Sequence, residues 1–155
     1  MVKLFNQKVA VMKTDARVLI IDDNVNLARG FALALERAGY EVAVAHTADD
    51  GLRLAAEQPP DAILLDFRMP FVNGVGFLYR LRDLPDLCEV PVMVITGGTV
   101  NQETLADLQD LHASLRFKPL ALSQLLEETR ALLATRDTSQ PLCVSQASRS
   151  AARSV

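Results

Sequence analysis

The sequence predicts an α/β protein: a parallel five-stranded sheet, doubly wound so that helices cover both of its faces. Short apolar runs alternate with segments of helical period, which is typical of strands joined by crossover helices. The runs are continuously apolar, as strands buried on both faces require. The five predicted strands are Val18–Ile21, Glu41–Ala45, Ala62–Leu65, Pro91–Thr96 and Ser114–Phe117.

The first two helices have recognisable ends. The first carries an apolar stripe and ends before Gly39, a residue type that often closes helices. The second runs from a cap at Thr47 through Glu57, with acidic residues in its first turn, where they face the positive end of the helix dipole. A pair of prolines ends it.

The later helices follow the same pattern. After the third strand, a loop containing Met69, Pro70 and Asn73 leads into a helix through Asp83. Apolar periodicity then predicts helices over 102–111 and 121–134. The last helix is rich in leucine. We interpret its leucines mostly as core, and any apolar excess on this face could mediate a homodimer.

One folded domain is expected over residues 16–135. A chain of 155 residues has the length of a single domain. Residues 1–15 form an N-terminal extension that either stays floppy or adds an edge strand through Val9 and Val11. Residues 136–155 are rich in Ser, Ala and Arg without apolar period, which indicates a disordered tail or the start of a linker.

Charge and composition argue against several classes of protein. The net charge is −3, and residues 16–135 hold 10 basic and 17 acidic residues, which argues against direct nucleic-acid binding. No apolar run approaches the ~18 residues of a membrane span, and no signal peptide is recognisable, so we expect a cytoplasmic protein without membrane contact. Cys88 and Cys143 fit neither a disulfide framework nor a metal spacing, and we expect both to be free.

Polar side chains follow the predicted strands where the strands end. Asp22 and Asp23 follow the first strand, Asp66 the third and Lys118 the fifth, while Thr96 ends the fourth. The carboxyl ends of parallel strands share one edge of the sheet, so these side chains should meet there. Crowded carboxylates need a counter-ion, and Mg²⁺ is the hard cation that prefers oxygen ligands.

This constellation predicts phosphoryl chemistry. With Mg²⁺ bound, Asp66 could attack a phosphoryl group and form an aspartyl phosphate, whose oxygens the Thr96 hydroxyl and the Lys118 ammonium would bind. Each residue alone has a plainer interpretation. Asp23 or Asn24 could simply cap the first helix, Thr96 could cap a later one, and a lone lysine is often a solvated charge.

The neighbours of Lys118 favour the functional interpretation. The apolar Phe117 suggests that the lysine stem emerges from the core, and Pro119 restricts the lysine to an extended backbone. His46 and His112 each stand alone in the sequence, and we interpret both as polar surface or loop residues.

Together the motifs resemble the receiver domain of two-component response regulators, of the chemotaxis-regulator type. The resemblance runs from Ala16 to about Thr135 and implies a flavodoxin-like (βα)5 fold with strand order 2-1-3-4-5. The matching motifs are Val18-Leu19-Ile20-Ile21-Asp22-Asp23, Leu64-Leu65-Asp66-Phe67-Arg68-Met69-Pro70 with Gly74, Ile95-Thr96-Gly97, and Phe117-Lys118-Pro119.

The resemblance implies a phosphoacceptor signalling domain rather than an enzyme. Asp66 would take a phosphoryl group from a phosphohistidine on a histidine kinase or phosphotransfer protein, and self-catalysed hydrolysis would later remove it. The resemblance also implies that Asp23, Asp66 and the backbone carbonyl of Arg68 coordinate Mg²⁺, with Asp22 reaching the metal through water. Thr96 and Lys118 would bind the phosphoryl oxygens.

The resemblance also implies that the phosphorylated domain signals by docking to a downstream protein. The docking face would here span residues 100–135. Leu115 stands where the family usually has Tyr or Phe, a ring that changes rotamer on phosphorylation. The usual switch is therefore in doubt in this chain, whereas the phosphorylation chemistry is untouched. Arg68 should overhang the site, and we hypothesise that it tunes dephosphorylation.

Three alternatives follow from the sequence. The chain could be a stand-alone receiver that acts by docking, or the receiver portion of a longer regulator or hybrid kinase. A small Mg²⁺-dependent phosphatase of the haloacid dehalogenase type is a remote third. Those enzymes place the nucleophile after the first strand with a second Asp two positions later, where this chain has Asn24.

Overall fold

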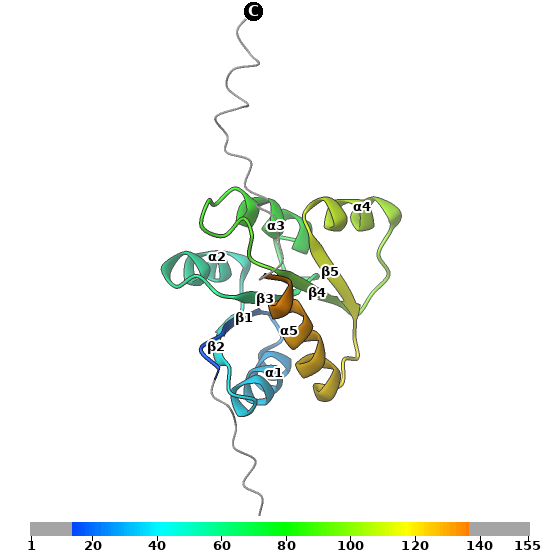
Figure 1. Ribbon diagram of the computed structural model, residues 1–155. Coiled ribbons are helices and arrows are strands. Elements are labelled where there is room, and N and C mark those ends of the chain that lie inside the picture. The colour runs from blue at the N-terminus through cyan, green and yellow to red at the C-terminus, as the bar shows by residue number, and fades with distance from the viewer. Residues whose placement is uncertain (1–13, 137–155) are drawn as a thin grey trace, which may run out of the picture.

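The computed structural model describes residues 14–136, and they adopt the predicted architecture. Five parallel strands lie in the order β2-β1-β3-β4-β5, and a helix follows each strand (Figure 1). The strands are β1 (Arg17–Ile21), β2 (Glu41–Ala45), β3 (Ala62–Asp66), β4 (Val92–Thr96) and β5 (Ala113–Phe117). The helices are α1 (Val25–Arg37), α2 (Ala48–Glu57), α3 (Gly74–Arg82), α4 (Gln102–Asp110) and α5 (Leu122–Arg136).

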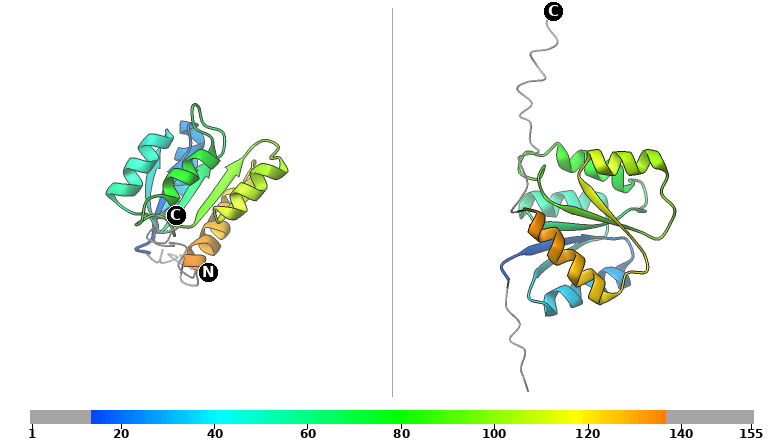
Figure 2. Two further views of the ribbon diagram at one scale, coloured as in Figure 1. Left: turned by 90° about the horizontal axis from the view of Figure 1, so that it is seen from above. Right: turned by 45° about the vertical axis from the view of Figure 1, so that its right-hand side comes forward.

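The sheet separates two apolar cores. Helices α1 and α5 cover one face, and α2, α3 and α4 cover the other, as Figure 2 shows from two further directions. Successive residues of a strand point to opposite faces. Leu19 and Ile21 therefore pack toward α2, while Val18 and Ile20 pack toward α1. Burial on both faces explains why the strand sequences are continuously apolar.

Short polar side chains set the helix starts, as the sequence predicts for α2. Asp50 donates its backbone N–H to the Thr47 hydroxyl at 3.1 Å. Asn73 accepts from the N–H of Gly76 at 2.8 Å and begins α3. At the other end of α1, Gly39 has a φ of 100°, a left-handed conformation that suits glycine.

Arg82 at the end of α3 joins the α3–β4 loop to the α4–β5 loop at the amino-terminal edge of the sheet. Its guanidinium donates to the carbonyls of Val90 at 2.7 Å, Leu111 at 3.0 Å and Leu87 at 3.4 Å. No carboxylate of the described residues pairs with it, and burial lowers the pKa of Arg82 to about 10, so it stays charged at neutral pH. No pattern in the sequence pointed to this role of Arg82.

Some details differ from the sequence-based expectation. Strand β1 begins one residue earlier, and α5 runs over Leu122–Arg136 instead of 121–134. The prediction that Cys88 is free is wrong, because this cysteine is disulfide-bonded. Cys143, the edge strand through Val9 and Val11, and the tail beyond residue 136 lie outside the described residues.

Among the described residues, none of the helices combines the length and hydropathy that a bilayer span requires.

Candidate functional site

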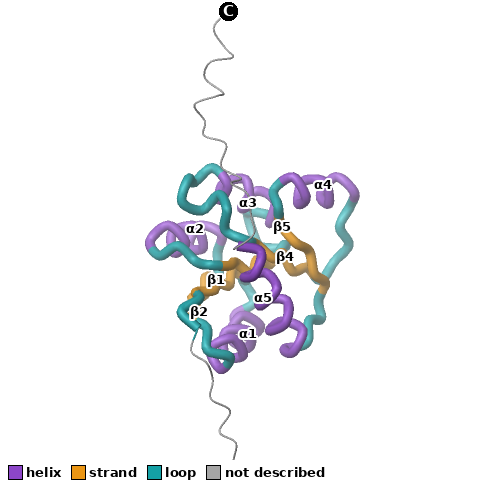
Figure 3. Tube along the Cα trace, in the orientation of Figure 1, coloured by secondary structure: helices purple, strands orange, loops and turns teal. Residues whose placement is uncertain are grey.

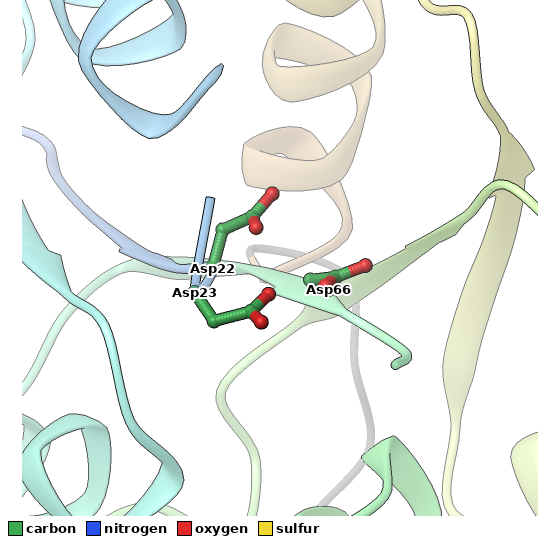
Figure 4. Close-up of side chains that lie close together, drawn as sticks. All are labelled: Asp22, Asp23 and Asp66. Atoms are coloured by element: carbon green, nitrogen blue, oxygen red, sulfur yellow. The ribbon is translucent and has the colours of Figure 1, made fainter. Parts of the chain in front are cut away.

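Three carboxylates meet at the carboxyl-terminal edge of the sheet, as predicted. Asp22 and Asp23 follow β1 and Asp66 ends β3, and these neighbouring strands bring the side chains together (Figure 4). One oxygen from each carboxylate lies within 4.8 Å of the others. Asp22 and Asp66 are buried, whereas Asp23 is exposed. Three convergent carboxylate oxygens fit the oxygen-rich, partly hydrated coordination that Mg²⁺ prefers.

Lys118 supplies the cation of this cluster. Its Nζ donates to Asp66 Oδ1 at 3.1 Å and to Asp22 Oδ2 at 3.3 Å. Its backbone N–H donates to the carbonyl of Thr96 at 2.8 Å, which fixes the lysine at the end of β4. The Lys118–Pro119 peptide bond is cis. The lysine therefore bridges two carboxylates from strands that lie far apart in the sequence.

The Lys118 side chain is only 23% exposed, although its apolar neighbour Phe117 lies at the surface. Phe117 is 57% exposed, so it does not hold the lysine stem in the core. The contacts to Thr96, Asp22 and Asp66 position the lysine instead.

The helix-cap interpretations of Asp23 and Thr96 are resolved by the contacts. Asn24 caps α1, because its Oδ1 accepts from the N–H of Leu27 at 3.1 Å, and this leaves the Asp23 carboxylate to the cluster. Asn101, not Thr96, caps α4. The Thr96 hydroxyl is buried and accepts from the N–H of Gly98 at 3.3 Å, so its proton can still be donated.

The ends of the strands hold the acidic residues through the backbone as well. Asp22 donates its N–H to the carbonyl of Ala45, and Asp22 Oδ1 accepts from the N–H of Asn24 at 2.8 Å. His46 lies at the end of β2 as an exposed residue, as predicted, and its Nδ1 is 2.9 Å from the carbonyl oxygen of Asp22. This contact is a positioning role that a lone histidine in the sequence did not reveal.

Burial dominates the electrostatics of Asp66. Desolvation raises the pKa of the Asp66 carboxyl above its ordinary value, and the Asp22 charge raises it further. The Lys118 ammonium and the backbone N–H of Arg68 act in the opposite direction but do not cancel the burial. The ionised Asp66 is therefore costly in the metal-free protein, and a bound cation would relieve that cost.

The raised pKa leads to a prediction about stability. A raised folded-state pKa means that the stability Asp66 contributes is fully present below its unfolded pKa, near 4, and is lost as the pH rises through the folded pKa. Without Mg²⁺ at pH 7, we expect Asp66→Asn to raise the free energy of unfolding by about 0.5–2 kcal/mol.

Urea denaturation with EDTA, at pH 4 and pH 7, measures this effect. The gain should be present at pH 7 and shrink toward pH 4. An equal gain at both pH values would contradict the electrostatic explanation.

The Arg68 side chain reaches from the end of β3 to the β4–α4 loop, at the edge of the sheet that carries Asp66. A Cβ atom on Gly98 would overlap the Arg68 guanidinium, so the side chain lies against the backbone of Gly98. Gly98 is outside the left-handed region of φ, so space, not conformation, is what glycine provides here.

Leu115, the residue at the predicted switch position, lies in β5. Leu115 is partly buried and packs against the core between the sheet and α2, α3 and α4. It pairs with Val94 in the register of β4 and β5, two residues before the pair of Thr96 and Phe117. His112, in the turn before β5, is exposed and has a φ of 52°.

Comparison with known proteins agrees with this geometry. Residues 18–130 match the model of the response regulator receiver domain. The chain is 34% identical to the transcriptional regulatory protein PrrA of Mycobacterium tuberculosis over 123 residues, which cover 79% of this chain and 52% of PrrA. It is 33% identical to the response regulator MprA of Mycobacterium ulcerans over 117 residues, 76% of this chain and 50% of MprA. The chain thus spans about half the length of these curated relatives.

Solved structures give the same result for the fold. The chemotaxis protein CheY4 of Vibrio cholerae superposes with a TM-score of 0.72 at 26% identity, covering 77% of this chain and 99% of CheY4. A CheY-like receiver domain protein from Methanospirillum hungatei superposes with a TM-score of 0.74 at 25% identity, covering 81% of this chain and 98% of that one.

Proposed function

Because this chain belongs to the response regulator receiver family, we propose that Asp66 accepts a phosphoryl group from a phosphohistidine of a histidine kinase or phosphotransfer protein. The observation that carries the proposal is the placement of Asp66, buried at the sheet edge beside two other carboxylates and within hydrogen-bond distance of Lys118. A carboxylate held beside a cation at an open edge can act as a nucleophile toward an anionic group.

Each residue of the site has a separate role in the proposed phosphoryl transfer. An Asp66 oxygen attacks phosphorus, the P–N bond of the donor breaks, and the leaving imidazole keeps the electron pair. Lys118 is held at 3.1 Å from Asp66 and neutralises charge on the transferred oxygens. The Thr96 hydroxyl donates to another of these oxygens. Asp23, Asp66 and the Arg68 carbonyl would hold Mg²⁺, with Asp22 contacting it through water, and the ion would supply further charge neutralisation.

In this proposal the phosphorylated chain signals by docking to another protein and does not release a catalytic product. The chain is then a phosphoacceptor and not an enzyme acting on other substrates. The relatives named as regulatory proteins are about twice as long as the matched region, which favours the receiver portion of a longer regulator as the second form of the proposal. The domain bounds 16–135, the cytoplasmic location and the homodimer through α5 stay predictions.

Phosphorylation with a small donor tests the function. Purified protein is treated with phosphoramidate and Mg²⁺ and its intact mass is measured. We expect one acid-labile phosphoryl adduct, absent in Asp66→Asn and retained in Asp86→Asn, which alters an exposed carboxylate on the loop after α3. No adduct on the wild-type chain would refute the proposal, as would an adduct that survives in Asp66→Asn.

The Arg68 hypothesis gives a second prediction. We expect Arg68→Ala to shorten the aspartyl-phosphate lifetime about tenfold, because the guanidinium beside the site contacts the phosphoryl group or obstructs water; this corresponds to about 1.4 kcal/mol in the barrier. Gly98→Ala should act in the same direction, since its methyl group displaces the guanidinium.

The lifetime is read from the decay of the phosphorylated mass after the donor is removed. Arg80→Ala, which changes an exposed arginine paired with Asp49, is the matched control. An unchanged lifetime in Arg68→Ala would sink the idea.

A further inference from the structure

Phe71, on the loop between β3 and α3, has an unusual combination of exposure and backbone conformation. The residue is fully exposed and is the most exposed large apolar residue among residues 14–136. Its φ is 70°. The residues on either side of it are joined by a hydrogen bond, in which the N–H of Val72 donates to the carbonyl of Pro70 at 2.9 Å. This is a γ-turn with positive φ at its centre, a rare and strained turn, and a bulky side chain makes it less favourable still.

The loop around Phe71 is otherwise held at both ends. Gly74 donates its N–H to the carbonyl of Phe67 at 3.0 Å, and Arg68 and Asn73 form a β-bridge. The Met69 side chain is buried in the core. The aromatic ring is therefore presented at the tip of an anchored loop. Neither its exposure nor its turn stabilises the isolated domain, and strain of this kind gathers at functional sites.

The tip stands at the edge of the sheet that carries Asp66. Four of the eight large apolar residues exposed within 14–136 lie on segments at this edge: Val25 begins α1, Leu122 begins α5, Phe117 ends β5, and Phe71 follows β3. The connecting loops are drawn in teal in Figure 3. Exposed apolar side chains thus lie on several segments at the edge of the sheet that carries the buried Asp66.

We propose that Phe71 is the apolar anchor by which the protein phosphodonor docks on this chain, inserting its ring into an apolar pocket of that donor. The inference rests on the proposed function. A protein that carries a phosphohistidine must bring phosphorus to bonding distance of the buried Asp66, so it must cover the loop that carries Phe71. A rigid aromatic side chain loses little conformational freedom on binding, which is why such residues dominate interface energies.

Two donors separate docking from chemistry. Phosphoramidate needs no protein surface, whereas transfer from a kinase does. The histidine kinases of the source organism are autophosphorylated and assayed singly on the wild-type chain, and the one that transfers fastest serves as the probe. For Phe71→Ala we expect about a 30-fold lower kcat/KM with that kinase, mainly through KM, and an unchanged rate with phosphoramidate.

Three further variants isolate the ring. Phe71→Gly removes the ring and relieves the turn, and it should slow kinase transfer as Phe71→Ala does. Phe71→Tyr keeps the ring and should transfer at nearly the wild-type rate. Tyr79→Ala removes another exposed aromatic side chain, on the outer side of α3, and should leave both donors unaffected.

The outcomes separate this proposal from the proposed function. Kinase transfer to Phe71→Ala within twofold of wild type overturns the anchor, as does equal loss with phosphoramidate, which would make Phe71 a support of the site. It is also overturned if no kinase transfers to a wild-type chain that phosphoramidate does phosphorylate. A wild-type dimer that Phe71→Ala converts to monomer, with transfer unchanged, would assign the ring to self-association. Failure of phosphoramidate on the wild-type chain refutes the proposed function itself.

Discussion

Replacing Lys118 with methionine is expected to slow phosphorylation by phosphoramidate about 10²–10³-fold, the usual loss when one donor to developing negative charge is removed. The ammonium lies between Asp22 and Asp66, and Thr96 holds its backbone, so no other described residue supplies a cation at the same position. Methionine keeps much of the length and apolar character of the stem while removing the charge. The loss therefore reports the charge and not the packing.

The rate of adduct formation, followed by intact mass, measures this effect. Lys118→Arg should recover only part of the rate, because a planar guanidinium does not reproduce the geometry of an ammonium. Arg53→Met, which breaks an exposed pair with Glu57, is the control and should react like wild type. A Lys118→Met rate within threefold of wild type would show that the lysine is a structural counter-ion only.

Replacing Arg82 with methionine is expected to lower the free energy of unfolding by about 3 kcal/mol, at roughly 1 kcal/mol for each of the carbonyl groups that lose their donor. The guanidinium joins the end of α3 to Val90 before β4 and to Leu111 at the end of α4. These carbonyls come from loops far apart in the sequence. No local contact can replace the lost donors.

Urea unfolding of Arg82→Met beside Arg80→Met gives a matched comparison on one helix. Arg80 pairs with Asp49 at 2.8 Å, but both side chains are at least half exposed, so we expect a loss below about 1 kcal/mol. Equal losses for the two variants would contradict the role assigned to Arg82. Phosphorylation of Arg82→Met below its unfolding transition should be normal, because its contacts lie at the edge of the sheet opposite Asp66.

The sequence by itself determined the element order and the carboxylate cluster. Continuous apolar runs identify strands buried on both faces, and such strands imply a parallel sheet with crossover helices. Once the sheet is parallel, any polar residue that directly follows a strand must lie at one edge. That rule alone brings Asp22, Asp23 and Asp66 together, and the family resemblance supplied the order of the strands.

Only the tertiary structure decided which competing local role each polar residue takes. Asn24 and Asp23 are equally good helix caps in sequence, and the contact to Leu27 assigns the cap to Asn24. Phe117 is a large apolar residue in a predicted strand, yet the end of β5 leaves it exposed. Helix and strand propensities depend on a residue and its neighbours in the chain. The choice of helix cap and the exposure of Phe117 depend instead on where distant segments of the chain lie.

The same reason explains why the long-range contacts of arginine and glycine were invisible. An arginine in the last turn of a helix favours the helix dipole whether or not it also binds distant carbonyls, so Arg82 looked ordinary. The lack of a side chain at Gly98 has meaning only because Arg68 occupies that space. The strained turn at Phe71 likewise arises from the anchoring of its loop at Met69, Asn73 and Gly74, and no periodicity in the sequence records it.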